Sequence, residues 1–423
     1  MKDNLPRRYT QDIDYKNMVP IHVVWEITLA CNLKCAHCGS RAGLQRPGEL
    51  SFEECKSVID HLSSLGTREI TIIGGEAFLR KDWLQIIEYI TNKGIDCSMQ
   101  TGAFMFNEKR ILDAKKAGIK NIGVSIDGLS KTHDEIRGRR GSFEHATRAL
   151  ELIKKHDLIS SVNTVITSKN KSELNSLLDT FIDLGVKNWQ VQLAVAMGNA
   201  VDNDYLLIQP FEIIEIIDRL FGLYKKGLKS DLLIQPGNNI GYFGPYEHIW
   251  RQGSYGYFNG CSAGNTSIGI EANGDIKGCP SLPTSSYVGG NIREMSLTDI
   301  WQHAEELKFT RKRNTNELWG GCKNCYYAEV CYAGCTWTGH VLLGKRGNNP
   351  YCYHRASELR KSGLFERISK ISNAPGTPFD HGAFQIEVVN LEDEVVDTQR
   401  SIDVNFNVSG SQDVPENQVP ERS

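Results

Sequence analysis

The sequence predicts an α/β fold whose centre is a parallel sheet. Six short runs rich in β-branched residues lie between residues 21 and 226, and six amphipathic stretches alternate with them. Repeated strand–helix units of this kind form parallel sheets with crossover helices. Six units are fewer than the eight of a closed barrel, so the periodicity leaves an open doubly wound sheet and a barrel-like sheet as alternatives.

The expected elements follow one another in a regular order. The strand candidates are Val23–Thr28, Glu69–Ile73, Asp96–Thr101, Asn121–Ile126, Ser160–Ile166 and Trp189–Leu193. The helix candidates are residues 51–65, 82–93, 107–117, 142–155, 171–184 and 210–226. The first helix should begin at Ser51, because Ser51 and Glu54 have the spacing of a capping box.

Length and composition restrict the class of protein. A chain of 423 residues suits one large α/β domain and one smaller domain. The formal net charge of −3 and the lack of a basic run argue against a nucleic-acid partner. No signal-peptide pattern and no run of about 18 apolar residues occurs, so we expect a cytoplasmic protein without a membrane partner. Twelve cysteines in a reducing compartment indicate metal ligands rather than disulfides.

Three cysteines follow the first expected strand. Cys31, Cys35 and Cys38 form a C-x3-C-x2-C run. An iron–sulfur cluster normally takes four cysteine ligands, so three thiolates on one loop would leave one iron open to a small molecule. Ligands gather at the carboxyl ends of parallel strands, and this loop lies at such an end.

Further polar residues lie at the ends of the other strands. Gly74-Gly75-Glu76 follows the second strand, where two glycines let the backbone approach a ligand and Glu76 adds an acceptor. The fourth, fifth and sixth strands contribute Ser125, Asp127, His133, Arg137, Asn163 and Gln192. Their shared position predicts one site at the carboxyl edge of the sheet.

The composition changes after about residue 230, where seven more cysteines lie between Cys261 and Cys352. Ser267–Gly278 is predicted to form a β-hairpin with a type I′ turn at Asn273-Gly274, and Ser296–Arg311 to form an amphipathic helix. The other two cysteines, Cys55 and Cys97, lie inside predicted elements and are expected to be buried apolar residues.

The seven cysteines admit a zinc and an iron–sulfur interpretation. Zinc sites usually combine paired C-x2-C knuckles, with four ligands to each ion. This region has one such pair, Cys322 and Cys325, and seven ligands do not divide into two closed zinc sites. They do divide as four plus three, which favours one closed cluster and one with a vacant corner, with zinc as the alternative.

The end of the chain is acidic. Residues 387–423 contain nine Asp or Glu and two Arg. We therefore expect residues 366–423 to form a flexible acidic tail.

Together these motifs resemble the radical S-adenosylmethionine (SAM) superfamily with a C-terminal SPASM domain. The superfamily signature is C-x3-C-x2-C with an aromatic-type residue before the last cysteine, and His37 occupies that position. The SPASM pattern, C-x9–15-G-x4-C followed by C-x2-C-x5-C-x3-C and a final cysteine, matches the second region. Its residues are Cys261, Gly274, Cys279, Cys322, Cys325, Cys331, Cys335 and Cys352. The match covers about residues 20–360.

The resemblance implies a fold and a division of the chain. The fold would be a partial (β/α)6 TIM-like barrel followed by a small α+β SPASM domain that carries auxiliary iron–sulfur clusters. Residues 1–20 would be an N-terminal extension, 21–230 the barrel, 231–365 the SPASM domain and 366–423 the tail.

The resemblance also implies cofactors and ligands, namely SAM and three [4Fe-4S] clusters. Cys31, Cys35 and Cys38 would hold the SAM-binding cluster. Gly74, Gly75 and Glu76 would contact the methionine amino group, Ser125 the ribose or methionyl part, and Arg137 the SAM carboxylate, with His37 beside the cofactor. Cys322, Cys325, Cys331 and Cys352 would close one auxiliary cluster, while Cys261, Cys279 and Cys335 would hold the other.

The chain departs from the family pattern at two places. Some relatives complete the second auxiliary cluster with an eighth cysteine, but none lies between Cys261 and Cys279 here. Many relatives have Thr-Asn-Gly after the third strand, whereas this chain has Thr101-Gly102-Ala103. No ligand role is therefore assigned to Gly102.

The resemblance implies an enzyme that modifies a ribosomally made precursor peptide by a crosslink or another oxidation. It would need an external one-electron reductant of the ferredoxin or flavodoxin type. Only about 20 residues precede the first strand, so leader recognition would need a separate protein or the C-terminal segment. The alternatives are a sulfatase-type protein maturase, a tetrapyrrole decarboxylase, and a non-enzymatic electron carrier or zinc module. No side chain is assigned as the catalytic acid or base.

Overall fold

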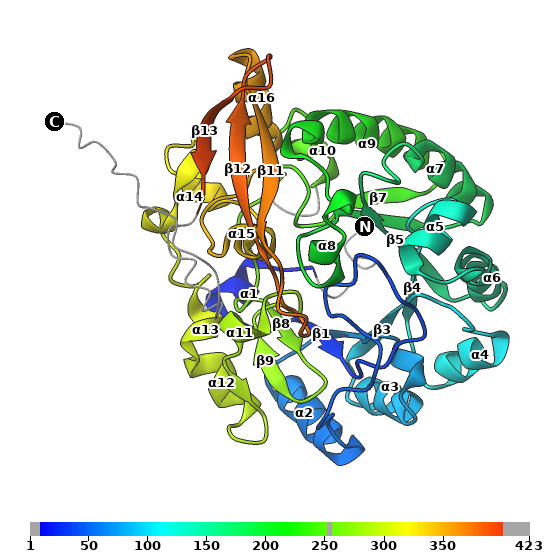
Figure 1. Cartoon of the computed structure of the whole chain (residues 1–423). Coiled ribbons are helices and arrows are strands. Elements are labelled where there is room, and N and C mark those ends of the chain that lie inside the picture. Colours follow the sequence, from blue (N-terminus) through cyan, green and yellow to red (C-terminus); the bar gives the residue numbers. More distant parts are fainter. Residues whose placement is uncertain (1–8, 252–255, 401–423) are drawn as a thin grey trace.

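The computed structural model describes residues 9–251 and 256–400, and its centre within these ranges is a curved sheet of ten strands (Figure 1). Seven consecutive strands pair in parallel in chain order. They are β1 His22–Glu26, β2 Glu69–Ile73, β3 Asp96–Thr101, β4 Asn121–Ser125, β5 Ile159–Ile166, β6 Asn188–Leu193 and β7 Leu233–Pro236. The predicted α/β fold with a partial barrel is confirmed. The sequence reading missed β7, because four residues ending on a proline give a weak strand pattern.

The cysteine-rich region extends the same sheet. Strand β8 (Ser267–Ile270) pairs in parallel with β1, and β9 (Asp275–Lys277) and β10 (Gly290–Asn291) continue antiparallel. The sheet therefore crosses the domain boundary expected at residue 230. The hairpin is confirmed, but the type I′ turn is wrong. That turn needs positive φ at both central residues, and φ is positive (92°) at Gly274 but not at Asn273.

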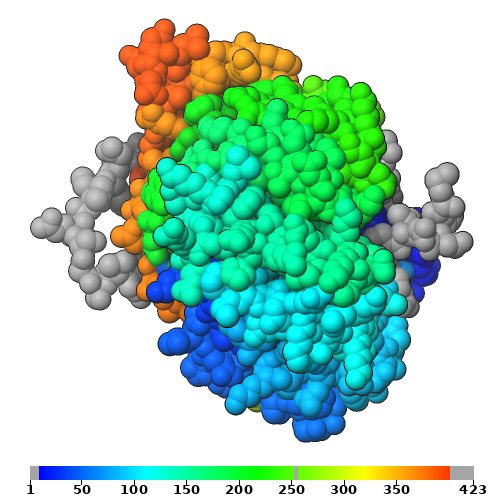
Figure 2. Space-filling model, turned by 90° about the vertical axis from the view of Figure 1, so that its right-hand side faces the viewer, coloured from blue at the N-terminus to red at the C-terminus, as the bar shows by residue number. Residues whose placement is uncertain are grey.

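Helices cover the outer face of the curved sheet, as Figures 1 and 2 show. They are α2 Phe52–Ser64, α3 Trp83–Asn92, α4 Glu108–Lys116, α5 Ser130–Arg137, α6 Ser142–Lys155, α7 Leu174–Asp183 and α9 Ile213–Leu228. The capping box of α2 is present: Ser51 N–H donates to Glu54 Oε2 at 2.7 Å, and Glu54 N–H donates to Ser51 Oγ at 3.3 Å. Helix α5 was not predicted, because its eight residues are mostly polar.

Shorter helices build the remainder of the described chain. The α-helices are α1 Asp12–Asn17, α8 Asn199–Asp202, α10 Glu247–Trp250, α11 Thr284–Tyr287, α12 Leu297–His303, α13 Glu305–Lys308, α14 Ala328–Cys331, α15 Thr336–Leu343 and α16 Tyr353–Lys361. The 3₁₀ helices are η1 Ala77–Leu79, η2 Asp204–Leu206, η3 Pro210–Glu212, η4 Thr315–Glu317 and η5 Gly320–Cys322. The single helix expected over Ser296–Arg311 is wrong, because the backbone is extended at Ala304 and separates α12 from α13.

The chain ends in a second, antiparallel sheet. Its strands are β11 Phe365–Ser372, β12 Ala383–Val389 and β13 Val395–Gln399, and in Figure 2 it projects beyond the barrel helices. The flexible tail predicted from residue 366 is thus wrong for residues 366–399, and residues 401–423 lie outside the described part. Arginines neutralise acidic side chains of this sheet: Glu366 pairs with Arg355, and Glu387 pairs with Arg367.

One hydrophobic core connects the barrel to the later regions, since it runs from Val23 on β1 to Leu342 on α15 and Ile386 on β12. Cys55 and Cys97 lie in this core with 0 % exposure, as expected for apolar packing residues. In the described ranges, every helix is too short or too polar to cross a membrane.

Candidate active site

The first three cysteines lie on the loop between β1 and α2. Burial raises the pKa of Cys31 to about 12 and that of Cys35 to about 11; the Cys38 thiol raises both further, and the Cys35 thiol also raises the pKa of Cys31. Backbone N–H groups point at the sulfur atoms, from Leu33 to Cys31 Sγ and from Ala42 to Cys38 Sγ, both at 3.4 Å. Metal binding must therefore displace the thiol protons, and the converging sulfurs and N–H donors suit an anionic cluster.

The Gly-Gly-Glu turn after β2 fits tightly against this loop. A Cβ at Gly74 would lie 2.6 Å from Thr28 O, and a Cβ at Gly75 would lie 2.5 Å from Ala30 O. Glycine is therefore required at both positions. The close contact brings Glu76 under the cysteine loop, where its backbone N–H donates to Ala30 O at 2.7 Å.

The Glu76 carboxyl group has one oxygen available for a ligand. Oε2 accepts the Gly102 N–H at 2.9 Å, whereas the buried Oε1 has no hydrogen-bond partner. Burial raises the pKa of Glu76 to about 7. Buried polar atoms are normally paired, so Oε1 is placed to accept a donor such as an ammonium group.

Helix α5 carries Arg137 to the cysteine loop. Its Nη1 donates to Cys35 Sγ at 3.7 Å, and its Nη2 lies 2.7 Å from Asp127 Oδ2. His37 Nε2 lies 2.6 Å from the same Asp127 oxygen. Although burial opposes ionisation, Arg137 and His37 hold the pKa of Asp127 well below its ordinary value. The carboxylate thus orients one cation and one imidazole beside the cluster loop.

A cavity of about 220 Å³ opens next to these groups. His37, Gly74 and Gln192 line it from the barrel, and Ser281, Trp337 and Phe379 line it from the later regions. Ser125 lies at the end of β4 opposite Asn163 on β5, so it is at the predicted carboxyl edge. The cavity therefore lies where the sequence placed the site.

The segment before β12 closes one side of the cavity. Asp380 Oδ1 accepts a hydrogen bond from Arg41 Nε at 2.8 Å, and Asp380 O accepts one from Gly198 N at 2.9 Å. These contacts hold the Phe379 ring over the Lys277 ammonium, 4.0 Å from Nζ to the ring centre. Phe379 thus forms part of one wall of the cavity.

Phe379→Ala is expected to admit water and to uncouple the reaction. A closed site suppresses side reactions, so the yield of deoxyadenosine per molecule of product should rise several-fold. The measurement is quantitative chromatography of both products from the same reaction. Phe365→Ala, which changes a ring on the far side of the SPASM region, is the matched control and should leave the ratio unchanged.

Four of the later cysteines come together around a small cavity of about 30 Å³: Cys322, Cys325, Cys331 and Cys352. Burial raises the pKa of Cys352 to about 12, and the charges of Cys322 and Cys325 add to this. Arg355 Nη1 donates to Cys322 Sγ at 3.8 Å. This is the set that the family pattern assigned to a closed cluster.

The remaining three, Cys261, Cys279 and Cys335, form a separate set. Burial raises the pKa of Cys335 to about 12, and Cys261 and Cys279 are its thiol neighbours. Trp337, Cys261 and Cys279 pack against the same small apolar cluster, and Trp337 also lines the active-site cavity. The Trp337 Nε1 donates to Met197 Sδ at 3.0 Å.

Unpaired buried polar atoms test whether the thiol sets fit inorganic groups. Except for Ser372 Oγ, all of those found in the described residues lie on the elements around the thiol sets. They are Asn32 Oδ1, Glu76 Oε1, Gln100 Oε1, His133 Nε2 and Arg137 Nε at the first set; Asn265 Oδ1, Arg313 Nε and Nη2, and Thr338 Oγ1 at the three-cysteine set; and Asn349 Nδ2 and Glu366 Oε2 at the four-cysteine set. Buried polar atoms are normally paired. The sulfides of a bound cluster accept hydrogen bonds and donate none, so they would partner donors such as Arg137 Nε, Arg313 Nε and Asn349 Nδ2 but not the unpaired oxygens.

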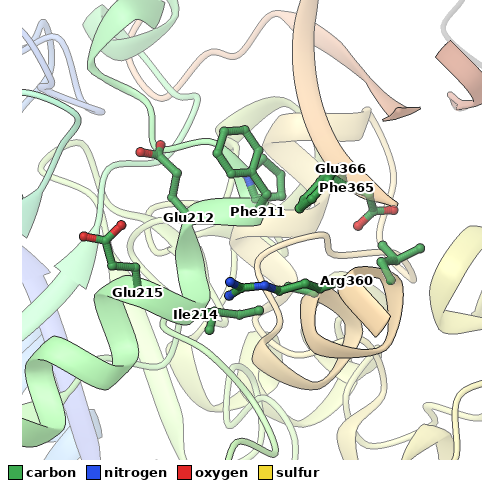
Figure 3. A pocket seen from close by; sticks show the side chains of 10 residues that line it. Phe211, Glu212, Ile214, Glu215, Arg360, Phe365 and Glu366 are labelled. Atoms are coloured by element: carbon green, nitrogen blue, oxygen red, sulfur yellow. The ribbon is translucent and has the colours of Figure 1, made fainter. Parts of the chain in front are cut away.

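A larger surface cleft of about 300 Å³ is unrelated to these residues. Figure 3 shows Phe211 and Glu212 on one wall and Arg360, Phe365 and Glu366 on the other. No cysteine lines it. The volume of a cavity alone therefore does not identify the reaction site of this protein.

Comparison with known proteins identifies the family. The Radical SAM superfamily matches residues 25–181, and an iron–sulfur cluster-binding domain called SPASM matches residues 261–326. The AdoMet-dependent heme synthase of Methanosarcina barkeri is 30% identical over 353 residues, which cover 79% of this chain and 97% of that protein. This chain is a radical SAM enzyme with a SPASM domain.

Other relatives of this radical SAM enzyme include a maturase and proteins of similar fold. The mycofactocin maturase MftC of Mycolicibacterium smegmatis is 26% identical over 322 residues, 75% of this chain and 78% of that one. Native anSMEcpe with bound AdoMet has a TM-score of 0.64 at 19% identity and covers 80% of this chain and 95% of its own. Streptococcus suis SuiB bound to S-adenosylmethionine has a TM-score of 0.61 at 18% identity and covers 76% of this chain and 74% of its own. These two likenesses support the fold.

Several residues of the site were not assigned from the sequence. Glu26 could have been found, because a carboxyl group interrupts an otherwise apolar strand. Trp337 gave a weaker signal as the second residue after a cysteine. Phe379 gave no signal in the sequence, because it lies in the segment that was expected to be flexible.

Proposed function

We propose that this enzyme cleaves SAM reductively and removes a hydrogen atom from a ribosomally made precursor peptide, which then forms a crosslink or another oxidised product. The position of the cavity carries the proposal. The cavity of about 220 Å³ lies beside the cysteine loop and is lined by Gly74 and His37 from the barrel and by Trp337 from the SPASM region, so the reacting part of a substrate would meet the SAM-binding loop there. The similarity to a mycofactocin maturase supports the same class of substrate.

The residues divide into three tasks under this proposal. Cys31, Cys35 and Cys38 would hold a [4Fe-4S] cluster, which when reduced supplies the electron that splits SAM into methionine and a 5′-deoxyadenosyl radical. Glu76 Oε1 would accept the methionine ammonium group, and Arg137 Nε, which has no partner among the described residues, would donate to the methionine carboxylate.

The remaining groups would bind the nucleoside and exclude water. Ser125 would contact the ribose or methionyl part from the end of β4, while Trp337 and Phe379 shield the cavity. The two later cysteine sets would hold auxiliary [4Fe-4S] clusters, giving three clusters in total. A ferredoxin- or flavodoxin-type protein would supply the electron, and a separate protein would present the leader peptide.

A second candidate is oxidation of an iron tetrapyrrole. The similarity to AdoMet-dependent heme synthases, at 30% identity for the protein from Methanosarcina barkeri, favours it. A macrocycle would require the segment around Phe379 to move away from the cavity, whereas a single side chain would not.

One experiment separates the two functions. The reconstituted enzyme is incubated anaerobically with SAM, dithionite and either the precursor peptide encoded beside its gene or iron coproporphyrin. We expect deoxyadenosine and a peptide mass change, commonly the loss of two hydrogens, in the first reaction only. An altered porphyrin with an unaltered peptide would reject the peptide proposal.

A further inference from the structure

Four charged side chains are buried together at the wall of the active-site cavity. Glu26 ends β1, Arg46 lies in the loop after the three cysteines, and Glu271 and Lys277 belong to the β8–β9 hairpin. Glu26 is 2 % exposed, and Glu271 and Lys277 are 0 % exposed. The region that carries the auxiliary cysteines thus brings charge to the first strand of the barrel.

Glu271 is the partner of both cations. Arg46 pairs with Glu271 Oε2, and Lys277 Nζ lies 2.6 Å from Glu271 Oε1. Lys277 Nζ also donates to Leu282 O at 2.6 Å, and Phe379 covers it. The two cations are therefore held by Glu271, and Glu26 forms no ion pair within the described part of the chain.

Glu26 instead faces the cavity. It lines the cavity together with Gly74, His37 and Ser281. Its one hydrogen bond in the described ranges is a long one, from Ala272 N–H to Oε1 at 3.4 Å. A carboxyl group with free acceptor positions on the wall of a reaction cavity can exchange a proton with a bound substrate.

We propose that Glu26 is the catalytic base that takes the substrate proton in the second half of the reaction. The proposal rests on the radical function above. One substrate C–H bond breaks first, and its hydrogen atom goes to the deoxyadenosyl radical to give 5′-deoxyadenosine. The substrate radical then loses one electron to an oxidised auxiliary [4Fe-4S] cluster and one proton to the Glu26 carboxylate, as a new bond forms within the substrate. The substrate loses two hydrogens in total: the first leaves as a hydrogen atom, and the second leaves as one proton and one electron.

The surroundings of Glu26 suit a group that changes protonation near neutral pH. Burial raises the pKa of Glu26 to about 7, the charge of Glu271 adds to this, and Arg46 and Lys277 oppose it. Among the described residues these three are the charged side chains with the largest effect on Glu26, and the His37 imidazole lines the same cavity. A base with a pKa near the working pH can both accept the proton and release it after turnover.

The first test uses Glu26→Gln, which keeps the shape of the side chain but cannot accept the proton. Deoxyadenosine formation should persist, while product per deoxyadenosine should fall by about 100-fold or more, and the acid limb of the product pH profile near pH 7 should disappear. Glu26→Asp should restore part of the product. Glu69→Gln, which changes a buried carboxyl at the opposite end of the barrel strands, is the matched control. Equal losses of deoxyadenosine and product in Glu26→Gln, or unchanged product, would overturn the assignment.

The second test does not depend on activity. The folded state binds the Glu26 proton more tightly than the unfolded state, so wild-type stability should fall as pH rises from about 5 to 8. The stability of Glu26→Gln should not show this decrease, so the melting temperature of the variant relative to that of the wild type should increase toward pH 8. Parallel melting curves across this range would contradict the proposal. Failure of the wild type to modify any peptide would instead reject the proposed function, and the melting curves alone would then test the protonation of Glu26, because they need no product.

Discussion

Cys35→Ala is expected to abolish SAM cleavage. Cys35 supplies one of three thiolates to the cluster that must bind SAM, and its sulfur also receives the Arg137 hydrogen bond. Without it, two thiolates cannot hold the cubane, so iron per chain should fall from about twelve to about eight. Deoxyadenosine formation should fall by at least about 1,000-fold. Iron analysis and chromatography after anaerobic reconstitution measure both quantities.

Cys97→Ala is the control for this prediction. Cys97 is fully buried on β3 and belongs to none of the three thiol sets. The variant should keep about twelve irons and its SAM cleavage, and lose about 1 kcal/mol of stability through the small cavity. A Cys35→Ala protein that retained the iron content and activity of Cys97→Ala would show that the loop does not hold the SAM-binding cluster.

Arg137→Met is expected to lower the free energy of unfolding by about 3–5 kcal/mol, because it removes one partner of a buried ion pair. Arg137 is 8 % exposed and lies 2.7 Å from Asp127, which is 0 % exposed. His37 and the Val165 N–H, which donates to Asp127 Oδ1 at 2.8 Å, would then remain to stabilise the Asp127 charge, without a permanent cation beside it. Anaerobic urea denaturation, followed by tryptophan fluorescence, measures the change.

The loss of stability in Arg137→Met should depend on pH. The pKa of Asp127 is lowered in the folded state, so its ion pairs stabilise the fold at neutral pH, and this stabilisation is lost as pH falls below about 4. The difference between Arg137→Met and wild type should therefore be largest near pH 7 and shrink toward acid pH. Arg140→Met, at an exposed position on the same loop, should match the wild type at every pH. An equal deficit at pH 7 and at about pH 2, well below the ordinary pKa of an aspartate, would mean that lost packing, not charge, causes the effect.

The sequence was sufficient to predict those features that depend on residues close together in the chain. The β-branched runs located β1 to β6, because a buried parallel strand needs consecutive apolar residues. The spacing of ten cysteines indicated one loop of three and a later group of four plus three, and the resemblance to the family implied the members of each set; the structure groups the later seven in the same way.

The sequence was insufficient where partners lie far apart in the chain. The C-terminal segment has an acidic composition, yet Asp380 before β12 is paired with Arg41, 339 positions away. Composition cannot reveal such pairs, so Phe379 and the closure of the cavity were missed. Glu26 was visible as a carboxyl in an apolar strand, but its relation to Lys277 and Glu271 depends on how β8 pairs with β1.

The pairing of β8 with β1 also determines how this protein can be divided. Four residues of β1, His22 to Trp25, share a backbone ladder with Ser267 to Ile270. A fragment that stopped before the auxiliary cysteines would leave this side of the central strand as a bare edge, open to association with other chains. The barrel and the SPASM region are therefore one cooperative folding unit, and neither half is a module that could be moved to another protein by itself.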